Sequence, residues 1–152
     1  MASSPLLHTS SVRFALGLWA GRISCSADES GHILTLSYSG HIRPAEMKKA
    51  LQSVQALAPR LKPGFVVLSD LTNLDSMEPA CADDLGAIAE QLSSYGISSV
   101  IRVTPDPAKD IGFNIVSIFH FRQPIKVLTR DSLAEAIKCL LLTECAAVTA
   151  DS

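Results

Sequence analysis

The segment Phe65–Leu71, with the sequence FVVLSDL, constrains the fold most because it is short, apolar and rich in β-branched residues. Such a strand is usually covered on both faces, as a central strand of a parallel sheet is. It follows the segment Pro44–Leu61, in which apolar residues recur at helical spacing. The sequence Lys62-Pro63-Gly64 ends that segment, because proline and glycine interrupt helices. A helix leading into a buried strand predicts an α/β fold.

The rest of the chain continues the alternation of strands and helices. Before the helix, two short alternating segments flank a turn at Asp28–Gly31 and predict a β-hairpin. The expected order is β-β-α-β-α-β-α-β-α: a mainly parallel central sheet with a hairpin edge, and four helices. The further elements are strands at Arg22–Ala27, Ile33–Ser39, Ser98–Thr104 and Ile125–Thr129, and helices after Pro79, over Pro107–Phe119 and from Ser132.

Composition indicates one domain with a large core. The chain has 152 residues, of which 47% are hydrophobic and 18% charged, and a net charge of −2 that disfavours nucleic-acid binding. Its longest apolar runs, Phe14–Gly21 and Ile111–Phe121, are too short to span a membrane. We expect a tail or edge strand over 1–21, including Val12–Leu18, a domain over 22–145 and a tail over 146–152. The four cysteines have no C-x-x-C spacing, which favours reduced thiols in the cytoplasm and no metal site.

Motifs for catalysis or cofactor binding are absent from the sequence, so we expect no cofactor and no enzymatic activity. Neither glycine-rich phosphate-binding motif occurs, and G-x-S-x-G is missing. A phospho-acceptor receiver domain is one alternative, because Asp70 ends the central strand, Thr104 ends the next and Lys126 lies in the last. Such a domain also needs an acidic pair after its first strand to hold Mg²⁺, and none follows the strand that ends at Ser39. We therefore interpret Asp70 as a turn-capping carboxylate. Cys81, on the apolar side of its helix, is predicted to be a buried, inert thiol.

Ser76 is the strongest candidate site in the sequence. It is predicted to lie at or just before a helix N-terminus, in the loop after the central strand. There its hydroxyl could cap the helix, which local sequence favours, or it could accept a phosphate that the positive helix end would stabilise. Asp70, Thr72 and Asp75 accompany it as candidate residues for phosphorylation or interaction.

The element order and several short patterns resemble STAS domains, the family of sulfate-transporter and anti-sigma-factor-antagonist domains. The segment Ile33–Gly40 is similar to the family's second strand, and Asp75-Ser76 is similar to the start of its D-S-S-G loop. Asp131–Ala136 is similar to its closing helix, so the resemblance covers Arg22 to Leu142. Met77-Glu78 stands where the family has Ser-Gly, which marks a divergent domain.

The resemblance implies a non-enzymatic regulatory module that binds a protein partner or a second copy of itself. An alternative function is a carrier of a small apolar ligand or lipid, with histidine and arginine interleaved among aromatic residues in the segment Ile111–Arg122. His120 by itself is more typical of a structural residue at a helix end. The candidate ligand or interface residues of this alternative are Phe113, Phe119, His120, Phe121 and Arg122.

Overall fold

A five-stranded mixed sheet forms the centre of the computed structural model, which describes residues 21–106 and 125–151, with side chains to residue 142. The strands lie in the order β1-β2-β3-β4-β5. The predicted hairpin is confirmed, since β1 and β2 pair antiparallel, whereas the other three neighbouring pairs are parallel. The bounds are β1 Arg22–Ala27, β2 Ile33–Ile42, β3 Val66–Met77, β4 Ser99–Val103 and β5 Lys126–Arg130.

Three α-helices lie in the described residues: α2 (Pro44–Leu57), α3 (Ala82–Ser94) and α5 (Leu133–Asp151). Short 3-10 turns, Ala58–Arg60 and Pro79–Cys81, follow α2 and precede α3. The sequence predicted a fourth helix over Pro107–Phe119 and an edge strand over Val12–Leu18, and both lie outside the described residues.

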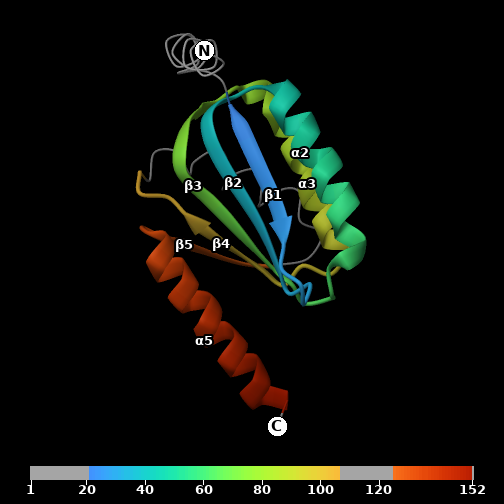
Figure 1. Ribbon diagram of the computed structural model, residues 1–152, viewed down its shortest axis with the longest axis vertical. Coiled ribbons are helices and arrows are strands. Elements are labelled where there is room, and N and C mark those ends of the chain that lie inside the picture. Colours follow the sequence, from blue (N-terminus) through green and yellow to red (C-terminus); the bar gives the residue numbers. More distant parts are fainter. Residues whose placement is uncertain (1–20, 107–124, 152) are drawn as a thin grey trace, which may run out of the picture.

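Helices cover the two faces of the sheet unequally (Figure 1). Helix α2 connects β2 to β3, and α3 connects β3 to β4. Each pair of strands is parallel and adjacent, and both connections advance in the same direction across the sheet. Right-handed crossovers must then place both helices on one face. The larger core lies there and includes Leu34, Val54 and Ile88, and α5 covers the other face, where Ala136 and Leu140 meet Ile101.

Helix α5 differs from the prediction in how its apolar residues are used. The sequence places Leu133, Ala136, Ile137, Leu140 and Leu141 on one buried stripe. The structure buries only Ala136 and Leu140 and exposes the other three, because α5, the one helix that the described residues place on this face, contacts the sheet along a narrow line. Ile137 and Leu141 line one side of a groove of about 360 Å³ beside the hairpin end of β1 and β2. No helix in the described residues is long and apolar enough to cross a membrane.

The Cys25 thiol in β1 provides a test of the packing at the hairpin edge. It lies opposite Leu36 and packs against the larger core, and this burial raises its pKa to about 11. At pH 8 the reactive thiolate fraction is then roughly 100-fold below that of an ordinary thiol. We expect iodoacetamide to alkylate Cys25 at least that much more slowly in the folded protein than in denaturant, as measured by peptide mass spectrometry. Equal rates in both states would show that β1 does not pack as described.

Candidate functional site

The candidate site lies where β2 and β3 continue beyond their neighbours. Strand β4 pairs with β3 over Val66–Asp70, whereas β2 pairs with β3 as far as Ile42 and Met77. Among the described residues, the end of β3 is therefore paired on one side only. We call this part, residues 39–42 and 73–77, the β2–β3 extension.

Two β-bulges set the register of the extension. Between the pairs Ser37↔Asp70 and Ser39↔Asn73, β2 advances by two residues and β3 by three. The register shifts again between Gly40↔Leu74 and His41↔Ser76. Gly40 has φ 70°, a conformation that costs glycine little and other residues more. Because each bulge adds one residue to β3, it changes which side chains face one another, and the result is that Ser76 lies opposite His41.

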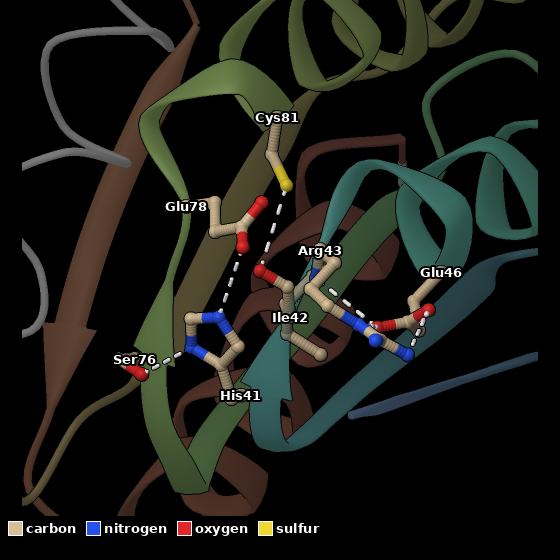
Figure 2. Close-up of polar contacts among 7 residues, drawn as sticks. All are labelled: His41, Ile42, Arg43, Glu46, Ser76, Glu78 and Cys81. Atoms are coloured by element: carbon tan, nitrogen blue, oxygen red, sulfur yellow. Dashed lines mark hydrogen bonds and ion pairs between the residues drawn. The ribbon is translucent and has the colours of Figure 1, made fainter. Parts of the chain in front are cut away.

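Ser76, His41 and Glu78 form a chain of hydrogen bonds at this end of the sheet (Figure 2). The Ser76 Oγ lies 2.6 Å from His41 Nδ1, and His41 Nε2 lies 3.3 Å from Glu78 Oε1. Ser76 is exposed, and the side chains of His41 and Glu78 are 22% and 42% exposed. The serine hydroxyl is thus open to solvent, and the imidazole behind it is largely covered.

Backbone contacts from Ile42 hold this hydrogen-bond chain in place. Ile42 is fully buried, and its carbonyl oxygen accepts the Glu78 N–H at 2.9 Å and a weak contact from the Cys81 thiol at 3.7 Å. Burial raises the pKa of Cys81, and the nearby Glu78 and Asp84 carboxylates raise it further. Cys81 has no exposed surface, which confirms the predicted burial, although it lies in the 3-10 turn before α3 and not in the helix itself. A thiol whose pKa is raised is poorly suited to act as a nucleophile.

Arg43 places a positive charge beside the hydrogen-bond chain. Glu46 accepts hydrogen bonds from the Arg43 backbone N–H and from its guanidinium, both at 3.1 Å, which caps the start of α2. These interactions raise the pKa of Arg43, and the charge of Glu78 raises it further. The Glu78 end of the hydrogen-bond chain is thus close enough to the Arg43 guanidinium to interact with it electrostatically.

The structure corrects the predicted position of Ser76. The sequence places it at or just before a helix N-terminus, but it lies within β3, and α3 begins only at Ala82. Pairing with β2 extends the strand through a segment that sequence patterns indicate is a loop. Because Ser76 has strand geometry there, its hydroxyl meets the side chain of a neighbouring strand.

Of the other predicted residues that the structure describes, Asp75 adjoins Ser76, whereas Asp70 and Thr72 interact with each other farther along β3. Asp70 Oδ1 accepts hydrogen bonds from the backbone and the hydroxyl of Thr72, at 3.0 and 2.5 Å, so Asp70 caps a local turn of the chain at the first bulge. At about 3.3 Å per residue, Thr72 lies roughly 13 Å along the strand from Ser76. Asp75 is exposed beside Ser76. The candidates Phe113, Phe119, His120, Phe121 and Arg122 lie outside the described residues.

Sequence reasoning missed His41 and Glu78. Glu78 carries only a weak signal, because it follows Ser76 by two residues but lies just beyond the end of β3. His41 has no comparable signal, since its approach to Ser76 depends on both bulges. In the described part of the chain, no three histidine, cysteine, aspartate or glutamate side chains are grouped so that they could hold a metal ion.

The sheet order, the hairpin edge and the helices on both faces define a STAS-like fold, and several solved structures share this fold. An uncharacterized protein of the DUF3478 family from Shewanella loihica, described as having a SpoIIAA-like fold, is 18% identical. The match covers 79% of this chain and 93% of that one, with a TM-score of 0.55.

Two further similar structures are bacterial regulators. SpoIIAA of Bacillus, a cell fate determinant solved in its phosphorylated form, is 11% identical over 78% of this chain and 98% of that one, with a TM-score of 0.50. An anti-sigma factor antagonist from Mycobacterium paratuberculosis is 17% identical over 77% of this chain and 92% of that one, also with a TM-score of 0.50. No protein-family model matches the sequence. No curated protein matches it closely enough to count as a relative.

Proposed function

We propose that this chain is a non-enzymatic regulatory module that binds a protein partner and is switched by phosphorylation of Ser76. The observation that carries the proposal is the position of the Ser76 hydroxyl, which is exposed at the end of the β2–β3 extension and hydrogen-bonded to His41. The shared fold with anti-sigma factor antagonists, one of them solved in a phosphorylated form, supports a regulatory role. The proposal places the protein in the cytoplasm.

The partner surface in this proposal consists of the exposed side of the extension and the adjacent start of α3. Ser76 and Asp75 are exposed on the strand, and Asp83 and Asp84 lie in the first turn of the helix. A phosphate on Ser76 adds nearly two negative charges to a surface that already carries carboxylates. A partner that binds the unmodified surface would then lose contacts and meet like charges.

A direct test combines phosphopeptide analysis with binding. The protein is purified from its native host and analysed by mass spectrometry with and without phosphatase, and phosphoserine is separately encoded at position 76 in recombinant protein. We expect Ser76 to be modified, and a partner identified with unmodified protein to bind at least about tenfold more weakly to the phosphoserine form. The measurement is the partner's Kd by calorimetry.

Ser30 provides the matched control, because it is an exposed serine that also contacts a histidine ring, in the turn between β1 and β2. Phosphoserine at position 30 should leave the Kd unchanged. The proposal fails if Ser76 and Thr72 are never modified in the host and phosphoserine 76 leaves the Kd unchanged. Analytical ultracentrifugation of the purified chain would show a dimer if the partner is a second copy of this chain.

A further inference from the structure

Two serine–histidine pairs occur in the described residues, and their hydrogen bonds run in opposite directions. Ser76 Oγ lies 2.6 Å from His41 Nδ1, and Ser30 Oγ lies 2.9 Å from His32 Nδ1. Which atom donates in each pair is decided by the partner on the far side, because each hydroxyl has one proton and a neutral imidazole has one N–H.

In the first pair, the far partner is a carboxylate on the ring. Glu78 Oε1 can only accept, so the neutral His41 ring carries its proton on Nε2 and leaves the Nδ1 lone pair directed at Ser76. The Ser76 hydroxyl therefore donates to Nδ1, and the lone pairs of its oxygen remain available to solvent. A serine whose proton is held by an imidazole that a carboxylate orients is the general arrangement of an activated nucleophile.

In the second pair, the far partner is a carboxylate on the serine. The Ser30 hydroxyl donates to Asp28 Oδ2, and Asp28 also accepts the Ile33 backbone N–H at 2.9 Å. Because the Ser30 hydroxyl proton is donated to Asp28, the Ser30 oxygen can only accept a hydrogen bond from His32. His32 therefore donates to Ser30 and does not draw a proton from it, so this pair lacks the activated arrangement.

We propose that His41 is the proton acceptor that makes Ser76 a nucleophile toward phosphoryl donors, with Glu78 orienting the ring. This inference rests on the proposed function, in which Ser76 accepts a phosphoryl group. The donor is a nucleoside triphosphate held by a partner kinase. The Ser76 oxygen forms a bond to the terminal phosphorus, the bond from that phosphorus to the nucleoside diphosphate breaks, and the hydroxyl proton moves to His41 Nδ1.

The carboxylates near His41 favour this proton transfer, whereas the positive charge of Arg43 opposes it and is offset by Glu46. Glu78 contacts Nε2 directly and stabilises the imidazolium that forms. Arg43 lies close enough to Glu78 to interact electrostatically with it, and Glu46 holds the Arg43 guanidinium at 3.1 Å. Asp84 adds a further negative charge on the α3 side of Cys81. After transfer, the imidazolium lies between the Glu78 carboxylate and the new phosphate, so it pairs with both.

The test is covalent labelling of the purified full chain with an alkyl fluorophosphonate, in which a serine oxygen–phosphorus bond forms and fluoride leaves. We expect the label on Ser76 and none on Ser30, as located by peptide mass spectrometry. His41→Gln should lower the labelling rate by roughly 100-fold or more, the usual contribution of a positioned base.

Three controls separate chemistry from folding. His32→Gln is the matched variant and should leave the labelling of Ser76 unchanged, and Ser76→Ala should abolish it. Added imidazole should restore much of the rate in His41→Gln, because a small base can enter the exposed site, and a purely structural role for His41 would not be restored in this way. Circular dichroism confirms that each variant is folded.

The outcomes distinguish this inference from the proposed function. Equal labelling rates in wild type and His41→Gln, or no label on Ser76 in folded wild type, would overturn the role of His41. If partner binding still depends on phosphoserine 76 in that case, the proposed function stands alone. If His41→Gln lowers the labelling rate as expected but phosphoserine 76 leaves the partner's Kd unchanged, the regulatory function fails and the role of His41 stands.

Discussion

Replacing Phe65 with alanine should lower the free energy of unfolding by about 3–5 kcal/mol, the usual cost of removing a large buried aromatic side chain. Phe65 is fully buried in the larger core, immediately before β3. Its carbonyl oxygen also accepts the Ser98 N–H at 2.9 Å, which joins the start of β3 to the start of β4. The cavity left by alanine would therefore lie where α2, α3 and the sheet meet.

Urea denaturation followed by circular dichroism measures this loss. Folded domains are stable by only about 5–15 kcal/mol, so the variant should unfold at markedly lower urea and its folding equilibrium should fall at least about 100-fold. Leu142→Ala is the control, since Leu142 is 71% exposed on α5 and its loss should change stability by no more than about 0.5 kcal/mol. A Phe65→Ala cost below about 1 kcal/mol would contradict its place in the core.

Gly31→Ala should be the second most destabilising change, at about 2–4 kcal/mol. Gly31 has φ 74° in the turn between β1 and β2, and a Cβ atom there would lie 2.3 Å from the Arg60 carbonyl oxygen. Its own carbonyl oxygen accepts the Lys62 N–H at 2.9 Å, so the turn is bonded to the connection between α2 and β3. Alanine must therefore adopt a strained backbone and displace a neighbouring segment as well.

Gly64→Ala separates these two causes. Gly64 also has a positive φ, 91°, but a Cβ atom there would meet no atom within 4 Å. This change should cost only the backbone strain, about 1–2 kcal/mol. The difference between the two variants in urea denaturation then measures the close approach of Gly31 to Arg60. Equal costs would show that the turn does not contact this connection.

Most element positions followed from local sequence patterns. The predicted strand Arg22–Ala27 has the same bounds as β1, and Pro44 begins α2 as predicted. Ser132 accepts the Glu135 N–H at 3.2 Å, as expected of the residue that caps α5. These features are set by neighbours in the chain, because turn residues, prolines and caps act on the backbone within a few positions.

The end of β3 could not be predicted in the same way. The residues Thr72–Ser76 include asparagine and aspartate, which are depleted in strands, and local patterns therefore indicate a loop. Pairing with β2 supplies backbone partners for this segment, which overrides its weak intrinsic preference. For the same reason, local patterns placed Ser76 at or just before a helix N-terminus, although it lies within β3.

Exposure on α5 could not be predicted either. Its apolar spacing indicates a buried stripe, but burial depends on how much of the sheet one helix can reach. The structure leaves Leu133, Ile137 and Leu141 exposed while it buries Ala136 and Leu140. Helical periodicity identifies a face of the helix but not the width of the surface that it meets.

The sequence by itself determined the alternation of strands and helices, the hairpin at the edge, and Ser76 as the candidate site, because each depends on residues near one another in the chain. Only the tertiary structure decided what surrounds that serine. Two bulges in β3 bring Ser76 opposite His41, and the buried carbonyl of Ile42 holds Glu78 beside the ring. The register of neighbouring strands depends on pairing along their whole length, so no local pattern around His41 could reveal its contact with Ser76.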